Sequence, residues 1–133
     1  MKKTIELFLY LMILLCSACS SFDNPVEQEK EDRYFFRYEV TCVSDSAKSI
    51  KKLYVITDKG NIITQMPEGK NTEWDATYGP VTKKCYIGLS CNDENEKINT
   101  NFHVKILVKR NDEPFVLKKE DSGSDVTLMY IIN

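Results

Sequence analysis

Hydrophobic and polar residues alternate with a period of two along most of the chain after residue 33. This period indicates β-strands with one buried face, because successive side chains of a strand point to opposite sides of its sheet. The clearest apolar series are Tyr34, Phe36, Tyr38, Val40 and Cys42; Cys85, Ile87, Leu89 and Cys91; and Phe102, Val104, Ile106 and Val108. The three series predict three long strands that supply the core.

A β-hairpin is predicted where two short apolar runs flank a tight turn. The runs cover residues 53–57 and 62–66, and the turn between them contains Asp58 and Gly60. Glycine adopts positive φ without steric cost, which a tight hairpin turn requires. We therefore expect these two runs to pair with each other.

Three weaker segments complete the predicted architecture. Residues 71–77 form a short strand with the only tryptophan, Trp74, and Gly79-Pro80 ends that strand. Residues 115–118 and 126–132 form the last two strands, joined by a polar turn over residues 120–125. About seven to eight short strands with almost no helix signal are typical of an all-β immunoglobulin-like or transthyretin-like sandwich. A closed barrel of the same strands is the alternative.

The first 18 residues have the pattern of a cleaved export signal. Lys2 and Lys3 precede an unbroken apolar run over residues 7–15, and a charged start before an apolar run is typical of signal peptides. A transmembrane helix needs about 20 apolar residues, and no other stretch approaches that length. We expect the mature protein to have no membrane-spanning helix.

A cysteine at the end of this segment indicates a lipid anchor. The small residues Ser17 and Ala18 directly precede Cys19, and the run from Cys16 to Cys19 resembles the lipobox of bacterial lipoproteins. The resemblance implies cleavage before Cys19 and acylation of Cys19 with chains such as palmitate, which would hold the protein on a membrane. The alternative is an ordinary signal whose cleavage leaves Cys19 as a thiol or removes it.

Residues 19–32 are expected to form a flexible tether between this lipid and a single domain over residues 33–133. Pro25 interrupts regular structure and residues 27–32 are almost all charged, so the tether cannot bury a core. Ser20 after the lipidated cysteine and the acidic tether resemble the sorting pattern of outer-membrane lipoproteins. The expected location is therefore the cell envelope, with the lipid in the outer membrane.

The charge balance argues against nucleic-acid binding. Signal cleavage removes Lys2, Lys3 and Glu6, so that 18 basic and 20 acidic residues become 16 and 19. Lysine pairs at 51–52, 83–84 and 118–119 are interspersed with acidic residues and lack the single-sign stripe that binds phosphate backbones. We interpret these lysines as solvated strand and turn residues.

The order of several short motifs resembles one protein family. The motifs are Tyr38-Glu39-Val40-Thr41, the hairpin segment 52–60, the lone Trp74, Tyr86-Ile87-Gly88-Leu89-Ser90, and residues 104–108. In this order they are similar to the periplasmic β-sandwich of the MmpS proteins, small partners of mycobacterial lipid-exporting transporters, and to small lipoproteins of gut Bacteroidetes. The resemblance implies an accessory module that supports an envelope protein or a transport complex.

Three cysteines remain in the mature domain, an odd number for an oxidising compartment. Cys85 and Cys91 lie about 20 Å apart along one strand face, which is too far for a disulfide. Cys42 is therefore the common partner, and a Cys42–Cys91 disulfide is favoured because each residue ends its apolar run, with Cys85 left as a thiol. Three buried, reduced thiols are the alternative, and the spacing does not suit zinc.

The sequence contains no constellation typical of an enzyme. His103 is the only histidine, and its buried neighbours in sequence place it on the solvent face of a strand, which favours a surface imidazole over a catalytic base. No nucleophile elbow, zinc-binding His-Glu-x-x-His or phosphate-binding glycine loop occurs. The acidic loop 92–96 lacks the ligand spacing of a calcium site. We expect a non-catalytic protein without metal or cofactor.

Two functional classes agree with these observations. The first is a tethered module that binds another envelope protein, in which an edge strand such as the segment around Trp74 accepts an added strand. The alternative is a surface receptor for a small ligand or a glycan, in which exposed Trp74 and Tyr78 side chains form a stacking platform.

Overall fold

The structure, a computed structural model, describes residues 30–43, 50–68, 72–92 and 100–133, and these contain eight β-strands and no helix. The strands are β1 (Tyr34–Val43), β2 (Leu53–Ile56), β3 (Ile62–Gln65), β4 (Glu73–Val81), β5 (Tyr86–Asn92), β6 (Asn101–Arg110), β7 (Val116–Gly123) and β8 (Asp125–Ile131). Residues Asp32–Asn133 form one unit with its own hydrophobic core. Such a core is the condition for a domain to fold alone.

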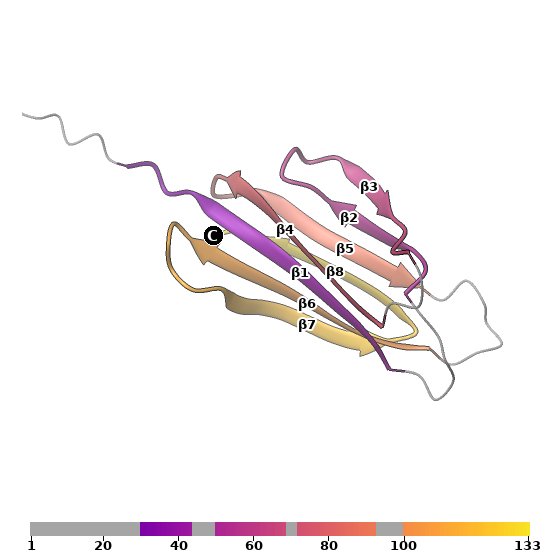
Figure 1. Ribbon diagram of the computed structural model, residues 1–133. Helices are drawn as coiled ribbons and strands as arrows, with labels where there is room; N and C mark the ends of the chain where they lie inside the picture. The colour runs from indigo at the N-terminus through magenta and orange to yellow at the C-terminus, as the bar shows by residue number, and fades with distance from the viewer. Residues whose placement is uncertain (1–29, 44–49, 69–71, 93–99) are drawn as a thin grey trace, which may run out of the picture. The chain divides into compact units, whose positions relative to one another are not determined.

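The strands form two antiparallel sheets that lie face to face (Figure 1). The first sheet has the strand order β4-β1-β6-β7, and the second has the order β3-β2-β5-β8. Among the described strands, no ladder joins one sheet to the other, so they form a sandwich and the barrel alternative is wrong. The prediction of an all-β sandwich with about eight strands is confirmed.

The core contains the apolar series that the sequence pattern predicted. In β1 and β6 every second side chain is buried, and Ile87, Leu89 and Cys91 bury theirs in β5. Cys85 differs from the prediction, because it lies one residue before β5 and is only half-buried. The largest fully buried side chains are Tyr38, Phe36, Ile50, Leu53, Ile87, Ile106 and Ile132.

The predicted hairpin is confirmed. β2 pairs with β3 from Leu53–Gln65 to Ile56–Ile62, and Gly60 in the turn has a φ of 75°. The Thr57 and Asn61 side chains hydrogen-bond to each other across the turn.

Two strand boundaries differ from the prediction. β4 does not end before Gly79-Pro80 but continues to Val81, because β4 is an edge strand, where proline is tolerated. β7 continues through Glu120 and Asp121 into the segment predicted as a turn. None of its side chains is buried, so β7 carries no apolar alternation that would mark it as a strand.

A tyrosine of the first sheet inserts its hydroxyl group into the second sheet. The β2–β5 ladder ends at Val55–Leu89, and its next pair would join Ile56 to Gly88. Instead the Tyr38 hydroxyl donates to the Ile56 carbonyl at 2.8 Å and accepts from the Gly88 N–H at 2.8 Å. Burial raises the pKa of Tyr38, so the phenol stays neutral and joins the sheets.

Candidate functional site

The four edge strands differ in how they resist pairing with another chain. Natural edge strands are protected by short length, charged side chains or proline. β3 has four residues, β4 carries Glu73, Asp75 and Pro80, and the centre of β7 is the charged run 118–121. β8 has seven residues and its only charged residue is Asp125 at its start. Among the described strands, β8 is therefore the least protected edge.

The hydrogen bonds at the end of β8 show which of its backbone groups face the free edge. The Ile132 N–H donates to the Cys85 carbonyl at 3.1 Å, and the Ile132 carbonyl accepts from the Lys84 N–H at 2.7 Å. Backbone groups alternate in direction along an antiparallel strand. The N–H and C=O groups of Thr127, Met129 and Ile131 therefore point away from β5, toward the open side.

A groove of about 360 Å³ lies at the end of β8, and its lining comes from β8, β5 and β7. We call it the β8 groove, and its lining residues are Tyr86, Lys119, Met129, Tyr130, Ile131 and Asn133. Tyr86 is 61% exposed, Met129 44% and Ile131 39%, which is unusual for large apolar side chains clustered on two neighbouring strands. Unpaired backbone groups beside apolar contacts are what an added strand requires.

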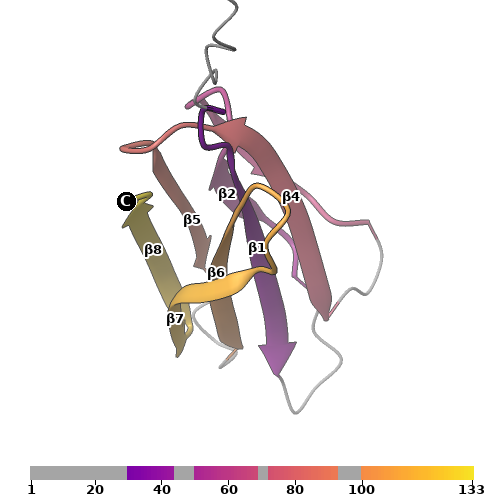
Figure 2. The ribbon, with the colours of Figure 1, turned by 90° about the vertical axis from the view of Figure 1, so that its left-hand side faces the viewer.

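A second opening, of about 270 Å³, lies where β7 and β8 diverge. The two strands are joined through Ser124, and Figures 1 and 2 show them separating toward the end of the domain that carries the C-terminus. We call this opening the basic cleft. Its apolar lining includes Val108, Val116, Tyr130 and Ile132, and its charged lining includes Lys83, Arg110 and Lys118 as cations and Glu113 as an anion.

The residues that precede β1 are fixed to the β6–β7 turn beside the basic cleft. The Asp32 carboxylate lies 2.8 Å from the Arg110 guanidinium, and the Asn111 N–H donates to the Arg33 carbonyl at 2.7 Å. The hydrogen bond from Arg110 is the main cause that lowers the pKa of Asp32. The chain thus enters the domain at the end where the basic cleft opens.

Trp74 and Tyr78 do not form the exposed platform that the sequence predicted. Both side chains are partly buried and pack against the core, because their positions on β4 pair with Val40 and Phe36 on the inward face of β1. The Tyr78 ring stacks on Phe36 with centroids 5.5 Å apart. The expectation of exposed rings is corrected, and ligand contact through either residue stays an untested prediction.

The three cysteines of the domain are thiols in this structure. Cys42 and Cys91 are both buried in the same core, on opposite sheets, whereas Cys85 is half-buried near the β4–β5 turn. Burial, with smaller contributions from Asp125 and Cys42, raises the pKa of Cys91 to about 12. A Cys42–Cys91 disulfide stays a prediction.

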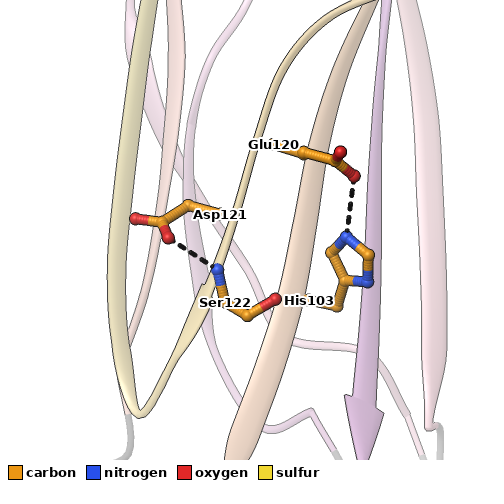
Figure 3. Close-up of polar contacts among 4 residues, drawn as sticks. All are labelled: His103, Glu120, Asp121 and Ser122. Atoms are coloured by element: carbon orange, nitrogen blue, oxygen red, sulfur yellow. Dashed lines mark hydrogen bonds and ion pairs between the residues drawn. The ribbon is translucent and has the colours of Figure 1, made fainter.

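His103 lies on the outer face of the first sheet with an acidic partner. Its Nε2 is 3.1 Å from Oε2 of Glu120, and the Ser122 N–H donates to Asp121 Oδ1 at 2.8 Å (Figure 3). His103 lines neither the β8 groove nor the basic cleft. Within the described ranges, no three His, Cys, Asp or Glu side chains come together as metal ligands.

Two sequence predictions fall largely or wholly outside the described residues. Cys19 and the export signal belong to residues 1–29, and most of the acidic loop 92–96 belongs to residues 93–99. Among the residues that the structure does describe, no helix has the length and apolar character needed to span a membrane.

Comparison with protein-family models, with curated proteins and with solved structures finds no match for this chain.

Proposed function

We propose that this chain is an exported lipoprotein, anchored in the outer membrane through Cys19, whose β-sandwich binds an extended segment of another envelope protein along β8. The domain acts as a non-catalytic accessory module. The observation that carries the proposal is the unprotected β8 edge beside the β8 groove.

The edge supports this proposal better than the segment around Trp74 does. On β4 the free edge carries the carboxylates of Glu73 and Asp75, and the inward-facing Trp74 packs against the core. On β8, Thr127, Met129 and Ile131 combine unpaired backbone groups with exposed side chains that bear no charge. An added strand gains main-chain hydrogen bonds from the edge and side-chain contacts from the groove.

Two proline variants distinguish the edges. Proline in place of Met129 removes an N–H that faces the open side of β8 without removing a bond to β5. Thr77→Pro is the matched control on β4, because the Cys42 N–H to Thr72 carbonyl bond of 2.7 Å places the Thr77 N–H on the free side. We expect the partner recovered from crosslinked envelopes to be lost with Met129→Pro and kept with Thr77→Pro. The reverse pattern, or no partner above background, would count against the proposal.

The anchor has its own test. After growth with a labelled fatty acid, we expect the label on the intact protein and its absence from a Cys19→Ser variant, because the cysteine sulfur is the site of acylation. Unlabelled protein recovered in soluble form would refute the anchor and leave partner binding at β8 to be judged separately.

A further inference from the structure

The end of the domain where the chain enters β1 carries an excess of positive charge. The β1 entry, the β6–β7 turn and the β4–β5 turn meet there, as the bonds Asn111–Arg33 and Lys84–Ile132 show. The β2–β3 turn lies at the same end, because β2 runs antiparallel to β5, which starts at the β4–β5 turn. The described cations at this end are Arg33, Lys59, Lys83, Lys84, Lys109, Arg110 and Lys118, against the carboxylates Asp32, Asp58, Asp112 and Glu113. This sign is opposite to that of the whole chain, whose formal charge is −2.

Four of these cations line the basic cleft, and they come from three different elements. Lys83 comes from the β4–β5 turn, Lys109 and Arg110 come from the end of β6, and Lys118 comes from β7. Asp32 neutralises much of the Arg110 charge at 2.8 Å, and Glu113 opposes the lysines. Of the three lysines, Lys109 places its ammonium group over the Phe35 and Phe115 rings. The cleft still combines the ammonium groups of Lys83 and Lys118 with the apolar side chains Val108, Val116, Tyr130 and Ile132. An anionic headgroup with an apolar neighbour matches both parts of this lining.

The place where the chain enters the domain would keep this cleft within reach of a membrane that holds a lipid on Cys19. The Asp32 carboxylate forms an ion pair with Arg110, which lines the cleft. The chain therefore enters the domain beside the cleft. Asp32 lies thirteen positions after Cys19, and an extended chain over that many steps spans at most about 45 Å. A ligand confined within such a reach is present at an effective concentration of millimolar order, so a weak site is occupied.

We propose that the basic cleft binds the phosphate headgroup of an anionic lipid in the membrane that holds the anchor, and thereby orients the domain with its cleft toward the bilayer. The inference rests on the proposed lipid anchor for its geometry. It does not depend on a partner at β8. Lys83 and Lys118 supply the charge, and the apolar lining contacts the glycerol and the first methylenes of the lipid.

The test is an NMR titration of the chain that begins at Ser20, which retains the whole described domain, with dihexanoyl phosphatidylglycerol below its micellar concentration. Dihexanoyl phosphatidylcholine is the zwitterionic control, and inorganic phosphate tests a free anion as the alternative occupant. The charge variant is Lys83→Gln with Lys118→Gln. Its matched control is Lys51→Gln with Lys105→Gln, which removes the same charge from residues outside the cleft.

With the anionic lipid we expect NMR chemical-shift changes centred on Val116, Tyr130 and Ile132. We expect the affinity for this lipid to be about tenfold weaker in the Lys83→Gln, Lys118→Gln variant and unchanged in its matched control. Equal affinity for the zwitterionic lipid, equal loss in both variants, or no shifts at the cleft would each overturn the proposal. Inorganic phosphate that binds as tightly as the lipid would also overturn it. Acylation of Cys19 is measured separately. A cleft that does not bind the anionic lipid and a Cys19 that is not acylated therefore give different results.

Discussion

At the scale of single residues, Tyr38 connects the two sheets by a polar contact within an apolar core. Its hydroxyl group both donates to Ile56 and accepts from Gly88, so it satisfies two backbone groups that the short β2–β5 ladder leaves open. A sequence pattern places Tyr38 in the core from its period, but it cannot show that the hydroxyl reaches the opposite sheet. That contact depends on how the two sheets are stacked.

Replacement of Tyr38 with phenylalanine tests this contact. We expect Tyr38→Phe to lower the free energy of unfolding by about 1–3 kcal/mol, because the buried Gly88 N–H loses its acceptor. Denaturant unfolding measures the change, and Tyr86→Phe is the control because Tyr86 is 61% exposed. Equal stability of the two variants would show that the Tyr38 hydroxyl is not needed.

The Asp32–Arg110 ion pair predicts a dependence of stability on pH. Because Arg110 lowers the folded-state pKa of Asp32, the ionised carboxylate stabilises the fold above its unfolded-state pKa of about 4. This contribution is lost as the pH falls through the lowered value. We expect Asp32→Asn to lower the melting temperature at pH 7 but to have little effect at pH 2, as followed by circular dichroism. An equal effect at both pH values would contradict the ion-pair account.

The thiols predict an order of reactivity. Cys91 is fully buried with a raised pKa, whereas Cys85 is half-buried, and only the thiolate reacts with alkylating reagents. In the reduced native protein we expect iodoacetamide to modify Cys85 first, and Cys42 and Cys91 only after denaturation. Peptide mass spectrometry gives the order, and early modification of Cys91 would be inconsistent with its burial. The same spectra without reductant test the predicted Cys42–Cys91 disulfide.

At the scale of elements, the strands that the sequence predicts best are those with one strictly buried face. β1, β6 and the β2–β3 hairpin follow from alternation and from one glycine turn. β7 could not be predicted over its full length, because all its side chains remain at least partly exposed and its run of charged residues has the composition of a turn. β4 was predicted too short, because a proline would end a central strand. In an edge strand such as β4, Pro80 is tolerated.

The direction of backbone groups along β8 predicts opposite effects for adjacent prolines. Met129→Pro should keep the fold, because the lost N–H faces away from β5, whereas Leu128→Pro removes a bond to β5 and distorts a buried position. We expect Leu128→Pro to be destabilised by about 3 kcal/mol or more and Met129→Pro by much less. Thermal unfolding measures both. Comparable loss in the two variants would mean that the assigned direction is wrong.

At the scale of the whole molecule, the candidate sites depend on topology rather than on motifs. Lys83 and Lys118 were interpreted as solvated residues of two separate pairs, and no local signal predicts that they line one cleft. That β8 is the least protected edge strand likewise becomes apparent only after the strand order shows which strands are edges. Trp74, in contrast, was predicted as an exposed ligand contact because it is the only tryptophan, but its side chain packs against the core. The class of fold, the main core residues and the β2–β3 hairpin follow from the sequence, whereas the candidate sites do not.

The central claim is that β8, and not β4, is the edge that binds a partner. The most direct measurement places a photoreactive amino acid at Thr127 on β8, and separately at Asp75 on β4, in the full chain within intact cells. The account predicts a discrete crosslinked adduct from Thr127 and none from Asp75. An adduct from Asp75 alone would move the binding edge to β4, and no adduct from either position would contradict partner binding along a sheet edge.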